Sequence, residues 1–327
     1  MSTRPIQILD SRTADQIAAG EVIEHPASVV KELVENSLDA GADQIAITVL
    51  QGGKRLIRVV DNGSGMDPAT LELAFSRFAT SKLAALGELA GITSLGFRGE
   101  ALPSIAAVAR VTLTSRRSRD LAARRIRREG GEGGAPVERG APEGTEVIVE
   151  DLFFNTPGRL KFLRGAPREL ARISGLVTTL ALAHPGCAFT LVSDERTVLR
   201  TAGDGSLLHA IGALYGQEAA AAALPLQQRD AEAGISLAGF ISAPHYSRAS
   251  RRWVTVVING RVVRSPALAG ALERAYGGML GRRRYPLAVL MLQVPPALLD
   301  INVHPAKSEI RLERPGRFSE LVFRAAR

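Results

Sequence analysis

The sequence predicts an α+β protein in which helices pack on mixed sheets, arranged as two domains. Its 327 residues exceed what one ordinary hydrophobic core holds, so we expect about two domains. Hydrophobic residues make up 46% of the chain and charged residues 23%, which is the composition of a folded globular protein. Stretches with apolar residues at helical spacing alternate with short runs in which every second residue is apolar. This alternation predicts helices and strands mixed along the whole chain.

The first domain is predicted over residues 1–206 and opens with helices that carry a start or a stop signal. These helices are expected at residues 13–20, 26–40 and 67–78. The second of them has a proline at its first position and a glycine directly after its end. After it, Ile45, Ile47 and Val49 alternate as in a half-buried strand. The turn at 51–54 then leads into a return strand over 56–60, which predicts a β-hairpin.

The second, smaller domain is predicted over residues 207–327. Before it, residues 116–144 are rich in Arg, Gly and Glu, and we expect a solvated hairpin tip there rather than a dedicated DNA contact. A polar segment at 217–234 follows the boundary. Beyond it come a strand over 253–258, an Asn-Gly turn, a helix opened by Ser-Pro, and a strand over 286–294. This succession predicts a β-α-β unit.

Composition also narrows the class of protein. No apolar stretch approaches the ~20 residues of a membrane-spanning helix, and the first ten residues lack the apolar region of a signal peptide. The single cysteine, Cys187, excludes an intrachain disulfide framework, fits a reducing cytosol and is expected to be buried. A formal net charge of +8 favours nucleic acid over an acidic membrane as a partner, although a GC-rich genome would also explain the arginine content.

The helix over 26–40 carries the first candidate site. Its apolar stripe, which should pack on a sheet, consists of Val30, Leu33, Val34 and Leu38. Its opposite face carries Glu32, Glu35, Asn36 and Asp39. Because Glu32 and Asn36 are four residues apart, their side chains lie side by side and could orient a water and a metal-bound phosphate. A solvated acidic face is the alternative, and the spacing does not decide between Glu32 and Glu35.

Two further signals have the chemistry of a nucleotide site. Asp61 ends a strand and could accept a hydrogen bond from an exocyclic amine, while Gly63 and Gly65 allow the backbone close to a flat ring. The alternative is an ordinary turn. The glycines of residues 96–99 lie directly before an apolar helical run, where free N–H groups attract phosphate. Neither a Walker A loop nor a GxGxxG motif is present, so another nucleotide fold is expected.

In order and spacing, Glu32…Asn36, Asp61-x-Gly-x-Gly65, Gly96-x-x-Gly99 and Gly144-Thr145 resemble the four nucleotide motifs of the GHKL ATPase superfamily. Within it, six runs resemble the MutL family: residues 16–24 (QIAAGEVIE), 31–41 (KELVENSLDAG), 79–82 (ATSK), 96–102 (GFRGEAL), 153–157 (FFNTP) and 300–307 (DINVHPAK). The resemblance implies a GHKL (Bergerat-type) α/β sandwich, followed by a domain resembling the second domain of ribosomal protein S5.

The resemblance also implies the cofactors ATP and Mg²⁺ and assigns roles to residues of this chain. Glu32 is the implied general base and Asn36 the implied Mg²⁺ ligand, Asp61 reads the adenine amino group, and Lys307 reaches the γ-phosphate from the second domain. The other implied nucleotide-binding residues are Gly63, Gly65, Thr80, Ser81, Lys82, Gly96, Phe97, Arg98, Gly99, Glu100, Ala101 and Thr145. One departure is Phe78, where several relatives have histidine. The five histidines show no metal-ligand spacing, and we expect them to be structural.

The implied function is slow ATP hydrolysis that times a DNA clamp in mismatch repair. ATP would order a lid over residues 79–95 and bring two N-terminal halves together as a homodimer. Candidate DNA-facing arginines are Arg164, Arg168, Arg261 and Arg264. The implied partners are DNA, a MutS-type mismatch sensor, a downstream endonuclease and helicase, and a sliding clamp, all in the cytoplasm. A C-terminal dimerisation domain, which would hold any endonuclease activity, is expected beyond residue 327. A type II topoisomerase-like ATPase subunit is the main alternative, and an Hsp90-type chaperone and a histidine kinase are weaker ones.

Overall fold

A computed structural model describes residues 10–80, 82, 94–96, 99–300 and 311–327. Contacts divide the chain into two compact units that alternate along the sequence. The first unit comprises Met1–Lys82, Gly96–Ile173 and Val192–Arg196, and the second comprises Leu83–Leu95, Ser174–Leu191 and Thr197–Arg327. The sequence predicts one boundary, at residue 206, whereas each of these units comprises three segments. The boundary at residue 206 stays a prediction.

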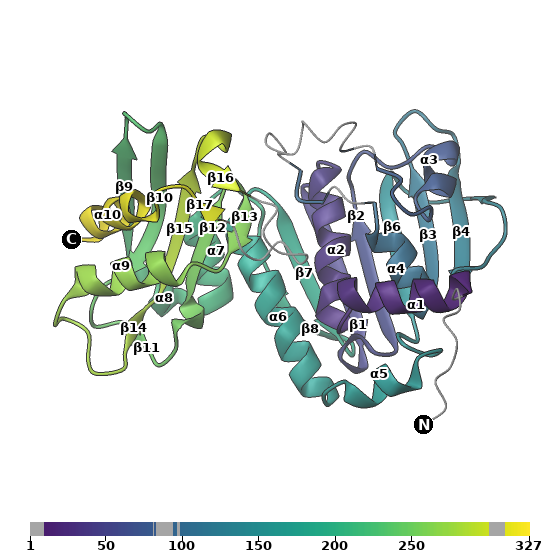
Figure 1. The fold of residues 1–327 in the computed structure, drawn as a ribbon, viewed down its shortest axis with the longest axis horizontal. Coiled ribbons are helices and arrows are strands. Elements are labelled where there is room, and N and C mark those ends of the chain that lie inside the picture. The colour runs from purple at the N-terminus through teal and green to yellow at the C-terminus, as the bar shows by residue number, and fades with distance from the viewer. Residues whose placement is uncertain (1–9, 81, 83–93, 97–98, 301–310) are drawn as a thin grey trace, which may run out of the picture. The chain divides into compact units, whose positions relative to one another are not determined.

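An eight-stranded sheet follows the order β5-β4-β3-β6-β2-β1-β7-β8 (Figure 1). Its strands are β1 (Gln44–Leu50), β2 (Leu56–Asp61), β3 (Arg110–Arg116), β4 (Ala123–Glu129), β5 (Val137–Arg139), β6 (Gly144–Glu150), β7 (Ala188–Ser193) and β8 (Arg196–Arg200). The helices of this part of the chain are α1 (Ser11–Val22), α2 (Pro26–Asp39), α3 (Pro68–Leu73), α4 (Ala101–Val108), α5 (Pro157–Phe162) and α6 (Ala166–Ala183). A single 3₁₀ turn, η1 (Gln51–Gly53), joins β1 to β2.

The helix α2 forms where the sequence predicts it. Pro26 occupies its first turn, and the His25 ring nitrogen Nδ1 accepts a hydrogen bond from the Ser28 N–H at 3.1 Å, which caps the helix. Val30, Leu33 and Val34 of its apolar stripe are buried, and Leu38, near the end of the helix, is partly exposed. Burial of this stripe against the sheet fixes which side chains of α2 remain on the opposite face.

The second unit contains a five-stranded sheet in the order β13-β12-β15-β10-β9. Its elements are α7 (Leu207–Tyr215), α8 (Gln217–Ala221), β9 (Ala223–Asp230), β10 (Ile235–Ser242), β12 (Val254–Ile258), β13 (Arg261–Val263), α9 (Pro266–Tyr276), β15 (Ala288–Gln293) and α10 (Pro315–Ala326). Short pairs complete it: β11 (Ser247–Arg248) with β14 (Tyr285–Pro286), and β16 (Leu299–Asp300) with β17 (Arg311–Leu312). The 3₁₀ turns η3 (Arg251–Trp253) and η4 (Pro296–Leu298) lie between them. Since β12 and β15 run parallel with α9 between them, the predicted β-α-β unit is confirmed.

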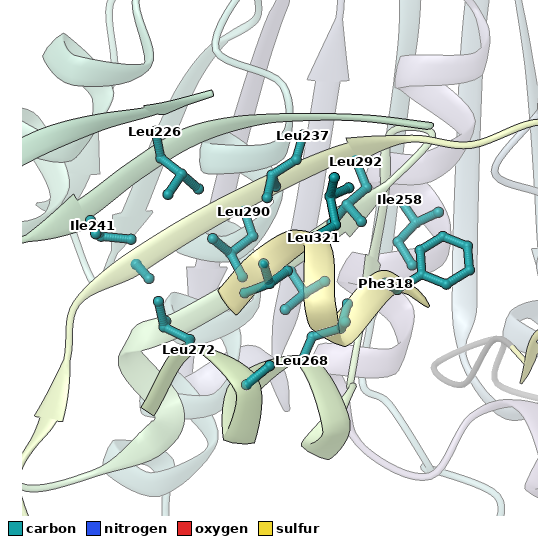
Figure 2. Close-up of a cluster of buried hydrophobic side chains, with 14 of the residues drawn as sticks. Leu226, Leu237, Ile241, Ile258, Leu268, Leu272, Leu290, Leu292, Phe318 and Leu321 are labelled. Carbon is teal, nitrogen blue, oxygen red and sulfur yellow. The ribbon is translucent and has the colours of Figure 1, made fainter. Parts of the chain in front are cut away.

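The core of this unit lies between the sheet and two helices. Figure 2 shows Leu268 and Leu272 of α9 and Leu321 of α10 around Leu290 of β15, and the ring of Phe318 of α10 beside Ile258 of β12. Phe318 is 1% exposed and Leu290 is 0% exposed. Burying side chains of this size stabilises the unit by about 1.5–3 kcal/mol each. This core therefore holds α9 and α10 against the five-stranded sheet.

Three expected segments differ in the structure. The helix expected over 67–78 ends at Leu73, because the chain then forms tight turns and the Phe78 N–H donates to Gly99 O at 3.2 Å. The arginine-rich segment 116–144 is a loop only in part, since β4 and β5 extend the sheet. The polar segment 217–234 contains α8 and the edge strand β9, one side of which faces solvent. Cys187 is buried, as predicted, and none of the described helices is long and apolar enough to span a membrane.

Candidate functional site

Asp61 lies at the end of β2 with its carboxylate held by three donors. The strand register places it opposite Thr145 of β6, which brings together two motifs that are 84 residues apart in the sequence. Its Oδ1 accepts hydrogen bonds from the Gly63 N–H at 3.0 Å and the Thr145 N–H at 3.2 Å. Its Oδ2 accepts one from the Ser37 hydroxyl of α2 at 2.6 Å. The carboxylate is therefore fixed in orientation before any ligand binds.

The environment of Asp61 also sets its titration. Only 8% of the residue is exposed. Burial raises the pKa of the Asp61 carboxyl above its usual value of 3.8, while the hydrogen bonds from Ser37, Gly63 and Thr145 act in the opposite direction. In its ionised form this carboxylate is a buried acceptor with a defined direction, which suits an exocyclic amine.

Two glycines at this site are required by the neighbouring backbone. Gly65 has a φ of +66°, and a Cβ there would lie 2.2 Å from Arg116 O. Gly144 has a φ of +107°, and a Cβ there would lie 2.0 Å from Asp61 O. Any side chain at either position would push β2 and its neighbours apart, so these glycines keep the strand ends in contact.

Two serines complete this site and were not among the predicted site residues. Ser115 Oγ lies 2.9 Å from Thr145 Oγ1, and it accepts a hydrogen bond from the Met66 N–H at 2.8 Å. Ser37 is 3% exposed on the sheet-facing side of α2. A polar residue inside an otherwise apolar helical stripe was the signal for Ser37. The alternating polar residues of β3 gave only a weak signal for Ser115.

The acidic residues Glu32 and Glu35 of α2 differ in exposure and in their contacts with Lys31. Lys31 Nζ lies 2.9 Å from Glu35 Oε2 and 3.3 Å from Glu32 Oε1. Glu35 was expected on the polar face, but it is 8% exposed because its carboxylate turns into this ion pair. Burial lowers the pKa of Lys31, yet attraction and hydrogen bonds from Glu32 and Glu35 outweigh it and raise that pKa above 10.5. The Glu32 side chain keeps 21% exposure, so it is the more accessible carboxylate.

Farther along α2, a cation lies beside Asn36. Lys82 Nζ donates to Asn36 Oδ1 at 3.0 Å and to Asp39 Oδ2 at 2.6 Å. Asp39 Oδ2 also accepts a hydrogen bond from the Gly96 N–H at 2.9 Å, and Asp39 was not a predicted site residue. Amide and carboxylate oxygens that already hold an ammonium group are a suitable donor set for Mg²⁺. Within the described residues, no cluster of three or more His, Cys, Asp or Glu side chains has the geometry of a metal site.

The glycine segment before α4 is described in part. Gly99 has a φ of +62°, and a Cβ there would lie 2.4 Å from Ala79 O, so this position also needs glycine. Thr80 Oγ1 accepts a hydrogen bond from the Lys82 N–H at 3.1 Å. Glu100 is the N-cap of α4 and Ala101 its first residue, as the glycine-then-helix pattern predicts. The predicted site residues Ser81, Phe97, Arg98 and Lys307 lie outside the described residues.

The four arginines proposed for DNA fall into two groups. Arg164, Arg168 and Arg264 are exposed. Arg261 is 6% exposed, and its guanidinium donates to the main-chain oxygens of Leu95, at 3.2 Å, and Ser94. Its burial and its carbonyl partners set Arg261 apart from the three exposed arginines, and a DNA contact by any of the four stays a prediction.

Two family models match the chain. Residues 23–143 match the model described as histidine kinase-, DNA gyrase B-, and HSP90-like ATPase. Residues 211–327 match the model described as DNA mismatch repair protein, C-terminal domain. The first range contains Glu32, Asn36 and Asp61, whose contacts are described above.

Known proteins resemble the chain over nearly its whole length. It is 48% identical over 322 residues to the DNA mismatch repair protein MutL of Symbiobacterium thermophilum, covering 98% of this chain and 50% of that relative. The Aquifex aeolicus MutL ATPase domain complexed with ADP matches with a TM-score of 0.66 and 30% identity, covering 92% of this chain and 98% of that one. The crystal structure of the N-terminal domain of a DNA repair protein matches in fold, with a TM-score of 0.80 at 24% identity, over 95% and 96% of the two chains. The chain spans about half the length of the curated relatives it matches, and these likenesses confirm the predicted fold class.

Proposed function

The chain belongs to the MutL family of DNA mismatch-repair proteins, and from this premise we propose that it is an ATP-gated DNA clamp that hydrolyses ATP slowly. The observation that carries the proposal is the Asp61 carboxylate, which is buried and held by Gly63, Thr145 and Ser37. Ser37 lies on α2, the helix that also carries Glu32 and Asn36. An adenine amino group is a hydrogen-bond donor, and the Asp61 carboxylate has further lone pairs that can accept from it.

The residues present fit an adenine nucleotide with Mg²⁺. Asp61 would accept from the adenine amino group, with Thr145 beside the base, and the glycines at 96 and 99 would turn backbone N–H groups toward the phosphates. Asn36 would hold Mg²⁺, which neutralises phosphate charge when it is bound. Since Lys82 donates to Asn36 Oδ1, we expect its ammonium group to leave that oxygen and turn to the phosphates.

Glu32 is the carboxylate that we propose as general base. It would accept a proton from the attacking water, because it is more exposed than Glu35, whose carboxylate is committed to Lys31 at 2.9 Å. We further propose that Ser81, Phe97 and Arg98 contact the nucleotide and that Lys307 reaches the γ-phosphate. A lysine in that role distinguishes ATP from ADP, so hydrolysis would release the clamp.

We propose DNA and a MutS-type mismatch sensor as partners, and a downstream endonuclease, helicase and sliding clamp as proteins acting later, in the cytoplasm. Any endonuclease activity would belong to the part of the family that this chain does not cover, because the chain spans half of its relatives. A topoisomerase-like ATPase subunit is not favoured, since residues 211–327 match the mismatch-repair model.

Nucleotide-driven dimerisation tests the clamp directly. We expect sedimentation velocity to show a monomer alone and a dimer with Mg²⁺ and a non-hydrolysable ATP analogue, because an ATP-bound lid would create the contact surface. Asp61→Asn serves as the matched control and should stay monomeric with the analogue. A sedimentation coefficient that the analogue leaves unchanged in the wild-type chain would contradict the clamp.

Binding to DNA should be governed by salt. We expect the logarithm of the association constant to fall linearly with the logarithm of salt concentration, with a slope of about −0.9 per phosphate contacted. Arg168→Glu should weaken binding and reduce this slope by about 1 or more. Arg324→Glu is the control, since Arg324 is 69% exposed but already pairs with Glu320 at 2.7 Å. Fluorescence anisotropy between about 50 and 200 mM salt measures both effects. Equal losses of DNA affinity in the two variants would contradict a DNA contact by Arg168.

A further inference from the structure

Two arginine-rich runs meet on the second unit. The short strands β11 and β14 pair, with Arg248 opposite Tyr285 in the register (Figure 1). Arg284, directly before Tyr285, donates to the Ser247 hydroxyl at 3.0 Å. The pairing therefore brings residues 248–252 beside residues 282–284. We call the arginines of these two runs the arginine cluster: Arg248, Arg251, Arg252, Arg282, Arg283 and Arg284.

Aromatic rings hold one member of the arginine cluster in place. The guanidinium carbon of Arg248 lies 4.2 Å from the centre of the Tyr246 ring and 5.0 Å from that of the Trp253 ring. Trp253 packs on Tyr215 of α7, with ring centres 4.8 Å apart, and both rings border a buried hydrophobic cluster of this unit. A guanidinium that is already held against two rings loses little further freedom when an anion binds, so Arg248 is preorganised.

In the described part of the chain, a carboxylate pairs with only one member of the arginine cluster. Arg251 donates to both oxygens of Glu273, at 2.7 and 2.9 Å. The Arg248 guanidinium donates to the Tyr246 hydroxyl, and its buried Nε has no acceptor among the described residues. Positive charge is thus concentrated here without an equal number of acids. The members of the cluster exposed to solvent are Arg251, Arg252, Arg282, Arg283 and Arg284.

This arrangement suits a chain of phosphates better than an acidic peptide. Protein partners draw most of their binding energy from apolar anchors, whereas the rings of Tyr246 and Trp253 are already covered by Arg248. Charge is what remains for a ligand, and the backbone of DNA is bound chiefly through charge. Each guanidinium also presents paired donors that match two oxygens of one phosphate.

We propose that the arginine cluster is a contact surface for the phosphate backbone of DNA, additional to the arginines predicted from the sequence. Arg252, Arg282 and Arg283 contact phosphates from the solvent side, and Arg248 supplies a fixed charge behind them. The inference rests on the proposed function for DNA as the partner, and it assigns to that partner a site formed within the second unit alone.

The test uses Trp253, which is the only tryptophan in the sequence and lies beside Arg248 and Arg252. Duplex DNA added to the full chain without nucleotide should change the Trp253 emission with the same midpoint as the anisotropy of labelled DNA. We expect Arg252→Gln/Arg283→Gln to weaken DNA binding at least about fivefold at ~100 mM salt and to reduce the salt slope by about 2. The emission change should be lost at the DNA concentration that saturates the wild-type chain.

The matched control is Arg200→Gln/Arg229→Gln, which also removes two exposed charges, from β8 and β9. It should keep the emission change and most of the DNA affinity. Equal losses in the two double variants, or an unchanged Trp253 emission at saturating DNA, would overturn the proposal. So would polyglutamate that changes this emission and displaces DNA, because the partner would then be an acidic polypeptide.

Two further outcomes are separable. If circular dichroism shows that Arg252→Gln/Arg283→Gln is unfolded, Arg282→Gln decides: a salt slope smaller by about 1 supports the surface, and a wild-type slope overturns it. A wild-type chain that binds no DNA by anisotropy at low salt contradicts DNA as a partner in the proposed function. DNA binding without a response of Trp253 refutes the arginine cluster and leaves the proposed function standing.

Discussion

We expect Glu32→Ala to lower ATP turnover by about 10²- to 10⁴-fold while ATP binding is retained, which is the range for loss of a sole general base. Binding should persist because the Asp61 carboxylate is held by Ser37, Gly63 and Thr145, and none of these hydrogen bonds involves Glu32. The fold should persist because Lys31 keeps its 2.9 Å contact with Glu35. Steady-state phosphate release and calorimetric titration with an ATP analogue measure the two effects.

The control for this prediction is Glu35→Gln. It removes the neighbouring carboxylate charge from the same lysine and the same helix, but Glu35 is 8% exposed and committed to Lys31. Turnover in Glu35→Gln should therefore stay much closer to that of the wild-type protein. Wild-type turnover in Glu32→Ala, or an equal loss in both variants, would remove Glu32 from the role of base.

Asp61→Asn should weaken ATP binding at least about 100-fold without unfolding the protein. The amide oxygen can keep the bonds from the Gly63 and Thr145 N–H groups. The amide nitrogen then takes the place of Oδ2, where Ser37 can accept from it and donate to Leu33 O, 3.2 Å away. The fold is satisfied, but a donor now stands where the adenine amino group needs an acceptor.

Calorimetric binding and thermal unfolding measure this variant, and tight ATP binding by a folded Asp61→Asn would contradict the adenine contact.

Low pH should weaken ATP binding, as Asp61→Asn does. Burial raises the pKa of Asp61 above 3.8, so its carboxylate is protonated, and ATP binding weakened, at a higher pH than for an ordinary aspartate. The effect of pH on folding stability has the opposite sign. A raised carboxyl pKa contributes stability that is present at low pH and lost as the pH rises through that pKa.

Much of the architecture followed from local pattern. The stripe of α2, its proline start, the β1–β2 hairpin and the β-α-β unit each depend on residues a few positions apart, which is why period and turn signals predict them. The order of the four motifs was equally a property of the chain alone. It predicted the fold class and the family before any contact between the motifs was known.

Other features depended on contacts between distant residues. The register of β2 against β6 places Thr145 at Asp61, and the packing of α2 places Ser37 there as well. Burial separated Glu35 from Glu32 and Arg261 from Arg264, although each pair reads alike in the sequence. Local pattern determines which element a residue joins, whereas solvent access and hydrogen-bond partners are set by what packs against that element from elsewhere in the chain. For that reason the sequence identified the nucleotide motifs, and only the tertiary structure showed that Ser37 and Thr145 hold Asp61 and that Arg261 is buried.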